Sequence, residues 1–163
     1  MARLTIRNVK ESDLDRCFEI ETLAYAGEEA ATKEKILTRI KGYAKGFIVL
    51  ENENEIIGFI NSGATHKVVL SDETFKELVG HDPDGLYIVI MSVVIHPDYQ
   101  GQSFTTKLMN HFIAQMKQLN KTSICLIGQT ELVEMYAKYG FTHLGESDSS
   151  HGGLSWHEMS LTL

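Results

Sequence analysis

The chain has 163 residues with 22 acidic and 15 basic side chains, so its formal net charge of −7 argues against a nucleic-acid-binding surface. No apolar run reaches the length of a membrane span, and the first residues lack the apolar core of a signal peptide. The length favours one domain over residues 1–163, and the two cysteines, both in apolar surroundings, indicate a reduced, cytoplasmic protein.

The first half of the chain predicts a strand, two helices, a β-hairpin and a variable loop. Alternating polarity indicates the strands, and apolar residues at helical spacing indicate the helices. Ser12 and Thr32 are residue types that cap helix N-termini. The expected elements are a strand over 3–9, a helix over 13–26, a helix after Thr32, hairpin strands over 47–50 and 56–60, and a loop with a short helix over 66–84.

The most informative stretch follows. Residues 86–95 are an almost unbroken apolar run rich in β-branched side chains, which predicts a strand buried on both faces. Pro97 ends this strand, and the polar loop 100–103 opens into an amphipathic helix from Phe104 to Leu119. The first amides of a helix lack internal partners and its dipole favours anions, so this strand, turn and helix predict a phosphate site.

The rest of the chain predicts two more strands, a short helix and a polar loop. Their expected ranges are 122–127 for a strand, 130–139 for the helix, extended chain from 140, 147–153 for the loop and 156–163 for the last strand. The predicted order is therefore β-α-α-β-β-β-α-β-α-β-β.

The central stretch resembles the acyl-CoA-binding motif of the GNAT superfamily of N-acetyltransferases, in which a strand leads into Q/R-x-x-G-x-G/A. The matching run is Gln100-Gly101-Gln102-Ser103-Phe104-Thr105, where Ser103 and Thr105 replace the small residues usual in the family. The order of elements is also the family's order, so the resemblance covers essentially the whole chain. It implies an α/β fold with a single mixed, mostly antiparallel sheet, flanked by helices and splayed at the acyl-CoA site.

The same resemblance implies acetyl-CoA as the acyl donor and assigns the residues that would bind it. Backbone groups of the splayed strand would contact the thioester and the pantetheine arm, and the loop amides would hold the pyrophosphate. The implied cofactor-binding residues are Val93, Val94, Ile95, Gln100, Gly101, Gln102, Ser103, Phe104, Thr105 and Thr106.

Tyr136 is the expected general acid. The leaving thiolate needs a proton donor, and a tyrosine with a pKa near ~10 stays protonated at neutral pH. The run from Glu134 to Phe141 is similar to the family's F-Y-x-x-x-G-F signature, with Met135 in place of the phenylalanine. That resemblance implies a position for Tyr136 beside the CoA sulfur; the alternative is an ordinary core tyrosine.

Residues 26–35 and 147–159 resemble the arylalkylamine N-acetyltransferases and their microbial relatives, which implies that Glu28, Glu29 and Met91 line the amine site. The vertebrate enzymes carry two histidines where this chain has Val89 and Met91, so the base must come from elsewhere. The candidates are Ser92, a water chain, Glu29 and His151, of which His151 is the best titrating group near neutral pH.

The sequence thus predicts an enzyme that transfers acetyl from acetyl-CoA to a primary amine of a small molecule, arylalkylamine or polyamine-like, by direct attack. A protein N-terminus, a lysine or an aminoglycoside is the alternative acceptor. The replacements at Ser103, Thr105, Val89 and Met91 also leave open a non-catalytic CoA-binding sensor. We expect no metal, since the histidines lack metal-ligand spacing; no nucleic-acid or membrane partner is expected, and a homodimer is left open.

Overall fold

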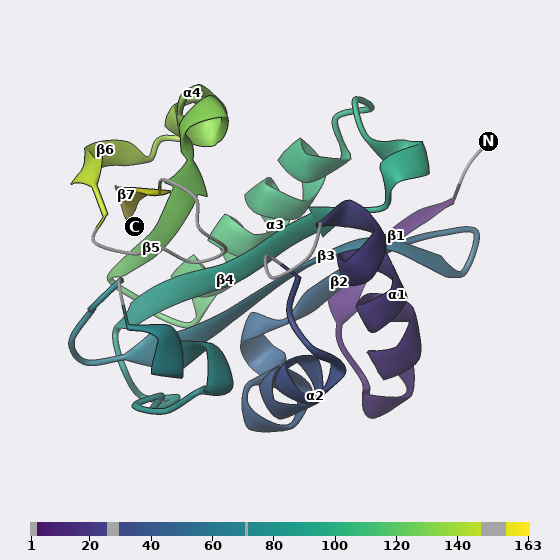
Figure 1. Cartoon of the computed structure of the whole chain (residues 1–163), viewed down its shortest axis with the longest axis horizontal. Helices are drawn as coiled ribbons and strands as arrows, with labels where there is room; N and C mark the ends of the chain where they lie inside the picture. The colour runs from purple at the N-terminus through teal and green to yellow at the C-terminus, as the bar shows by residue number, and fades with distance from the viewer. Residues whose placement is uncertain (1–2, 26–29, 71, 148–155) are drawn as a thin grey trace.

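The computed structural model describes residues 3–25, 30–70, 72–147 and 156–163. In these ranges seven strands form one mixed sheet with the order β1-β2-β3-β4-β5-β7-β6 (Figure 1). Neighbouring strands are antiparallel, apart from the parallel pair β4 and β5. The strands are β1 Leu4–Asn8, β2 Ile48–Asn52, β3 Glu55–Thr65, β4 Tyr87–Ile95, β5 Ser123–Gln129, β6 Thr142–Glu146 and β7 Trp156–Thr162.

The helices connect these strands in the order that the sequence predicts. The α-helices are α1 Leu14–Ala24, α2 Lys33–Gly42, α3 Phe104–Gln118 and α4 Val133–Lys138. Short 3-10 turns are η1 Glu11–Asp13, η3 Ala44–Gly46, η4 Glu73–Glu77, η5 Pro97–Tyr99 and η6 Thr130–Leu132. None of the helices in the described ranges combines the length and apolar content that crossing a membrane requires.

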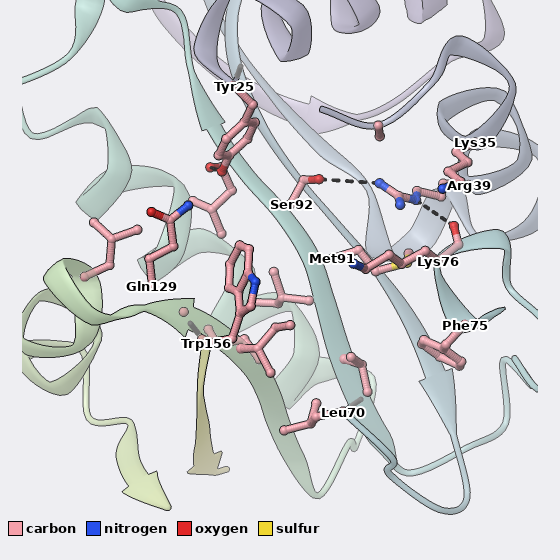
Figure 2. Close-up of a pocket in the computed structure, with 18 of the residues that line it drawn as sticks. Tyr25, Lys35, Arg39, Leu70, Phe75, Lys76, Met91, Ser92, Gln129 and Trp156 are labelled. Atoms are coloured by element: carbon pink, nitrogen blue, oxygen red, sulfur yellow. Dashed lines mark hydrogen bonds between the residues drawn. The ribbon is translucent and has the colours of Figure 1, made fainter. Parts of the chain in front are cut away.

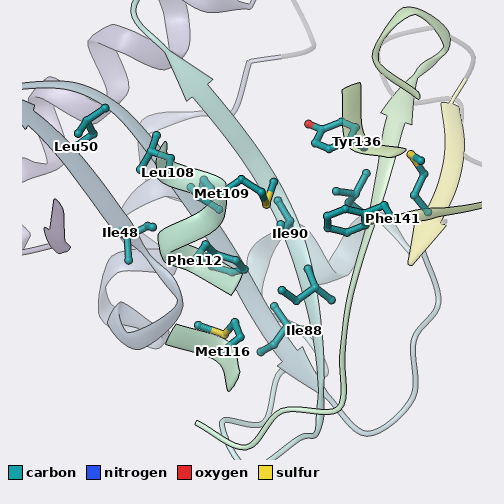
Figure 3. Close-up of a cluster of buried hydrophobic side chains, with 14 of the residues drawn as sticks. Ile48, Leu50, Ile88, Ile90, Leu108, Met109, Phe112, Met116, Tyr136 and Phe141 are labelled. Carbon is teal, nitrogen blue, oxygen red and sulfur yellow. The ribbon is translucent and has the colours of Figure 1, made fainter. Parts of the chain in front are cut away.

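Two hydrophobic cores, one on each face of the sheet, hold the layers together. On one face α3 packs against β3 and β4 (Figure 3), through Leu108, Met109, Phe112 and Met116. On the other face α1 and α2 pack through Cys17, Ile20, Ile36 and Ile40. Each fully buried side chain of this size contributes about 1.5–3 kcal/mol. Strand β4 therefore lies between two packed layers, with α3 on one side and α1 and α2 on the other.

Several predicted boundaries need correction. Ser12 does not cap α1: a 3-10 turn precedes the helix, and there the Asp13 Oδ2 accepts a bond of 2.7 Å from the amide of Lys10. Thr32 caps α2 as predicted, since its Oγ1 accepts from the amide of Lys35 at 3.2 Å. Strand β3 is longer than its prediction over 56–60, and the helix predicted over 130–139 is divided between η6 and α4.

The prediction that residues 86–95 are buried on both faces is wrong in part. Along β4 buried residues alternate with half-buried ones, and the half-buried set is Val89, Met91 and Val93. Val89 and Met91 line a pocket, and Val93 lines the same pocket while also packing against the core on the α3 face. An apolar pocket wall and an apolar core demand the same residue types, which is why the sequence could not separate them.

Candidate active site

The sheet opens between β4 and β5. The two strands pair over Tyr87–Val89 and Ser123–Cys125 alone, although β4 runs on to Ile95 and β5 to Gln129. In β4, Met91 is an extra residue against β3, because Ser92 pairs with Asn61 and Ile90 with Ser62. A β-bulge of this kind bends the strand that carries it. The expected splay of the sheet is therefore present, with a bulge beside it.

The pocket lies where the two strands diverge (Figure 2) and encloses about 1040 Å³, including the space open to solvent. Its walls come from both strands, α1, α2, the segment around η4, α4 and the start of β7. Phe75, Leu70 and Trp156 give it an apolar side, and Glu21 and Arg39 give it a charged side. One end of the molecule thus combines an apolar slot with buried charges, as ligand sites do.

The backbone of β4 beyond the pairing with β5 is partly satisfied by side chains. The Tyr25 hydroxyl donates to the carbonyl of Val93 at 2.9 Å, and the Gln100 Nε2 donates to the carbonyl of Ile95 at 3.1 Å. Buried carbonyls need such partners because an unpaired one is costly. Gln100, predicted to bind the cofactor, therefore also ties the loop to the end of the strand, and Tyr25 is a pocket residue that the sequence analysis missed.

The N-terminus of α3 presents a row of amides. Gly101 has φ +77° and Ser103 has φ +66°, so the loop turns through two left-handed residues before the helix begins. The first backbone bond into the helix runs from the amide of Lys107 to the carbonyl of Ser103, at 3.3 Å. In the described part of the chain, no amide of residues 101–106 donates a hydrogen bond to another residue. Free amides at a helix start are what an anionic group needs.

Two other predicted cofactor residues have contacts of their own. The side chain of Val94 is buried in the core under α1 and α2, so only its backbone could face a ligand. The Thr106 Oγ1 lies 3.0 Å from the hydroxyl of Tyr139, which joins the first turn of α3 to the end of α4.

Tyr136 lies in the pocket wall, on α4. Its ring packs edge-on against Phe141, with 5.9 Å between centroids, and lies so close to Gly128 that a Cβ there would come within 3.2 Å of it (Figure 3). Burial raises the pKa of Tyr136, so the phenol stays protonated at neutral pH. None of the side-chain hydrogen bonds between described residues uses its hydroxyl.

Two buried charges in the pocket, Glu21 and Arg39, escaped the sequence analysis. They are 1% and 2% exposed. Burial lowers the pKa of Arg39 to about 10, while the nearby charge of Glu21 opposes this shift, so the guanidinium remains charged at neutral pH. A signal existed: Glu21 follows Cys17 by four residues and Arg39 follows Ile36 by three, which places both charges on apolar helix faces.

Ser92, one of the candidates for the base, has surroundings that do not suit this role. Its Oγ accepts from the Arg39 Nη1 at 3.4 Å, and an adjacent cation lowers the basicity of an oxygen (Figure 2). Glu28, Glu29 and His151 lie outside the described residues. Within the described ranges, no three histidine, cysteine or acidic side chains are grouped so as to hold a metal ion.

Comparison of the sequence with known proteins identifies the family to which the chain belongs. A model described as "Acetyltransferase (GNAT) domain" matches residues 19–163. The chain is 25% identical over 143 residues to the probable hydrolase YhcX of Bacillus subtilis, covering 83% of this chain and 28% of that protein. It is 30% identical over 96 residues to the uncharacterized N-acetyltransferase ycf52 of Porphyra purpurea, covering 58% of this chain and 51% of that protein. The chain therefore spans between about a quarter and half of the length of these curated relatives.

Solved structures show the same fold at low identity. The loading GNATL domain of CurA from Lyngbya majuscula has a TM-score of 0.86 at 19% identity, with 98% of each chain covered. The putative acetyltransferase yncA from Salmonella typhimurium, solved with its cofactor acetyl-CoA, has a TM-score of 0.70 at 18% identity, with 98% of this chain and 94% of that chain covered. Together with the family model, these likenesses show that the chain belongs to the GNAT acetyltransferase family.

Proposed function

We propose that residues 1–163 form a single catalytic domain that transfers acetyl from acetyl-CoA to the primary amine of a small molecule. The observation that carries this proposal is the splay of β4 from β5, which opens a pocket walled in part by α4, the helix whose end is joined to the first turn of α3 through Tyr139 and Thr106. Acetyl-CoA is bound by the Salmonella relative of the same fold, which supports this choice of donor.

The pyrophosphate of the donor is assigned to the amides of residues 101–106. These N–H groups make no hydrogen bond to another described residue, and the dipole of the fifteen-residue helix α3 adds partial positive charge. The chain carries a net charge of −7, so anion binding must come from such local groups rather than from the overall field. The pantetheine arm is assigned to the open edge of β4 at residues 93–95.

In the proposed reaction the neutral amine attacks the thioester carbonyl. A C–N bond forms, the C–S bond breaks, the sulfur leaves with its electron pair, and the attacking nitrogen releases one N–H proton, which balances the proton that the sulfur takes up. Tyr136 is the assigned acid that protonates this sulfur, because its buried phenol holds its proton at neutral pH. The amine must first lose a proton, at a cost of about 4–5 kcal/mol for an alkylamine at pH 7. We assign the role of accepting this proton to His151, Glu29 or a water chain.

The acceptor is proposed to be a small amine of the arylalkylamine or polyamine-like type. Phe75, Leu70 and Trp156 offer an apolar wall that suits a hydrocarbon or aromatic body. Helices α1 and α2 and the segment around η4 enclose the same space, which favours a small molecule over a folded protein surface. A homodimer and a cytoplasmic location stay predictions from the sequence.

Replacing Tyr136 with phenylalanine tests the proposed acid. We expect kcat for acetyl-CoA-dependent thiol release with an amine panel to fall by about 10²–10⁴-fold, because the sulfur loses its proton donor. Tyr87→Phe is the matched control: this tyrosine is exposed at the start of β4, does not line the pocket, and its loss should leave kcat unchanged. Equal rates for Tyr136→Phe and the wild type would remove Tyr136 from the chemistry.

The same assay separates an enzyme from a sensor. Thiol release with at least one amine supports the proposed transfer. Tight CoA binding without turnover on any amine would contradict it and favour the non-catalytic alternative.

A further inference from the structure

Arg39 is a buried cation that contacts no carboxylate among the described residues. Its side chain leaves α2 and ends in the pocket (Figure 2), where the residue is 2% exposed. Its hydrogen bonds go to neutral oxygens: Nε donates to the carbonyl of Lys76 at 3.1 Å, and Nη1 donates to Asn61 at 3.3 Å and to Ser92 at 3.4 Å. Among the described residues, no carboxylate oxygen lies within 4 Å of the guanidinium, and none accepts a bond from Nη2.

Such an arrangement is costly unless a ligand completes it. Burying a charge out of contact with a counterion carries a desolvation penalty, which neutral hydrogen bonds and the more distant charge of Glu21 offset only in part. The guanidinium is a planar fork of donors that matches a carboxylate, and Arg39 is part of the pocket wall. The pocket therefore supplies a site for a carboxylate at Arg39.

The position of Arg39 points to the acceptor rather than to the acyl-CoA. Helix α2 packs on one face of the sheet and α3, with the amides assigned to the pyrophosphate, packs on the other. Ser92, which bonds Arg39, is next to Val93, whose carbonyl receives the Tyr25 hydroxyl. A molecule held at Arg39 thus lies on the α1 and α2 face and reaches the open part of β4 from there.

The pocket wall includes other charged residues besides Arg39, namely Lys35, Lys76, Asp72 and Glu21. Lys76 is already paired with Glu73 at 2.8 Å, so it competes weakly for the carboxylate. Glu21 is buried one helical turn before Tyr25, and its Oε2 accepts from the amide of Ala31 at 3.2 Å. Arg39 is therefore the buried cation of this pocket to which the carboxylate is assigned.

We propose that Arg39 binds a carboxylate of the acceptor, so that the acceptor is an amino-acid-like molecule carrying both an amine and a carboxylate. This inference rests on the proposed acetyl transfer, and among small amines it favours acceptors that carry a carboxylate over plain arylalkylamines and polyamines.

Matched substrate pairs test the inference without changing the protein. Acetyl-CoA-dependent thiol release is measured with phenylalanine against phenethylamine and phenylalanine amide, with tryptophan against tryptamine, and with γ-aminobutyrate against butylamine. We expect kcat/KM to be about 10²-fold higher for the preferred carboxylated member than for its partner, since a charge-assisted pair with a buried guanidinium is lost in the partner. Thiol release with any amine supports the transfer; the ratio within a pair tests Arg39.

Variants of the chain connect this ratio to Arg39. Arg39→Met keeps the bulk of the side chain and should bring the ratio close to one, mainly by raising KM for the carboxylated substrate, whereas Arg39→Lys should keep part of the preference. Lys41→Met is the control, because Lys41 lies on the same helix with 60% of its side chain exposed and outside the pocket. If Arg39→Met does not fold, the amide and decarboxylated substrates still decide the matter with the wild type.

Three results would overturn the inference. Equal or better turnover of the partners that lack the carboxylate would make Arg39 a structural tie between α2, β3 and β4. An unchanged ratio in folded Arg39→Met would place the carboxylate elsewhere. Preference for malonyl-CoA or succinyl-CoA over acetyl-CoA, lost in Arg39→Met, would assign the carboxylate to the acyl donor instead.

Discussion

Ser103 shows how a single residue adapts the cofactor loop. It is the N-cap of α3 and has φ +66° and ψ +16°, a left-handed conformation that costs a residue with a Cβ about 1–2 kcal/mol. Its side chain makes no capping bond to the helix. The conformation, rather than the side chain, thus directs the amides that follow, and it is the conformation that glycine adopts most readily.

Replacing Ser103 with glycine should therefore stabilise the protein, by about 1 kcal/mol in the free energy of unfolding measured by urea denaturation. Ala114→Gly is the matched control, because Ala114 is exposed in the middle of α3 with helical dihedral angles, and there glycine should cost about 1 kcal/mol. Destabilisation by both substitutions to a similar extent would refute the strain assigned to Ser103.

At the scale of residues, the sequence predicted a pocket residue where a recognisable motif surrounded it in the chain. Tyr136 was placed by its surrounding motif and does line the pocket, although its role as an acid stays a prediction. Glu21 and Arg39 were not found, because a charge on an apolar helix face becomes meaningful only when the neighbouring elements bury it. Tyr25 was missed because its hydrogen bond joins it to Val93, 68 residues away.

At the scale of elements, α2 matters because it carries Arg39 into the pocket. Thr32 begins this ten-residue helix by accepting from the amide of Lys35 at 3.2 Å. A capping bond satisfies one of the amides that the first turn otherwise leaves without a partner. The cap therefore stabilises the element that holds the proposed carboxylate site.

Thr32→Ala should lower the free energy of unfolding by about 1 kcal/mol, since the amide of Lys35 loses its acceptor. Thr32→Ser keeps the hydroxyl and should remain close to the wild type. Urea denaturation of the three proteins measures the difference, and equal stability of the alanine and serine variants would show that the cap does not contribute.

Strand β4 marks the limit of what element-level patterns predict. Its bounds were predicted closely from its apolar run, as was the helix that follows. The bulge at Met91 could not be predicted, because it is defined by the register against β3 and not by the residues of β4. The alternation of buried and half-buried side chains along β4 depends on what covers each face of the assembled sheet, which the residues of β4 alone do not specify.

At the scale of the whole molecule, the fold separates two tasks. One face of the sheet carries α3 and the amides assigned to the donor, and the other carries α1 and α2 with the charges assigned to the acceptor. Figure 1 shows these helices on the two sides of the sheet, and the pocket at the splay between β4 and β5 takes its walls from α1, α2, the segment around η4 and α4. The order of elements predicted this arrangement through its resemblance to a known family.

Amide hydrogen–deuterium exchange with and without saturating acetyl-CoA tests the central claim most directly. A donor whose pyrophosphate accepts from the amides of residues 101–106 must slow exchange in that segment and along residues 89–95, while β1, at the far edge of the sheet, serves as the internal control. We predict that acetyl-CoA slows exchange in both segments and leaves the exchange rate of β1 unchanged. Unchanged exchange over residues 101–106 at saturating acetyl-CoA would contradict the account.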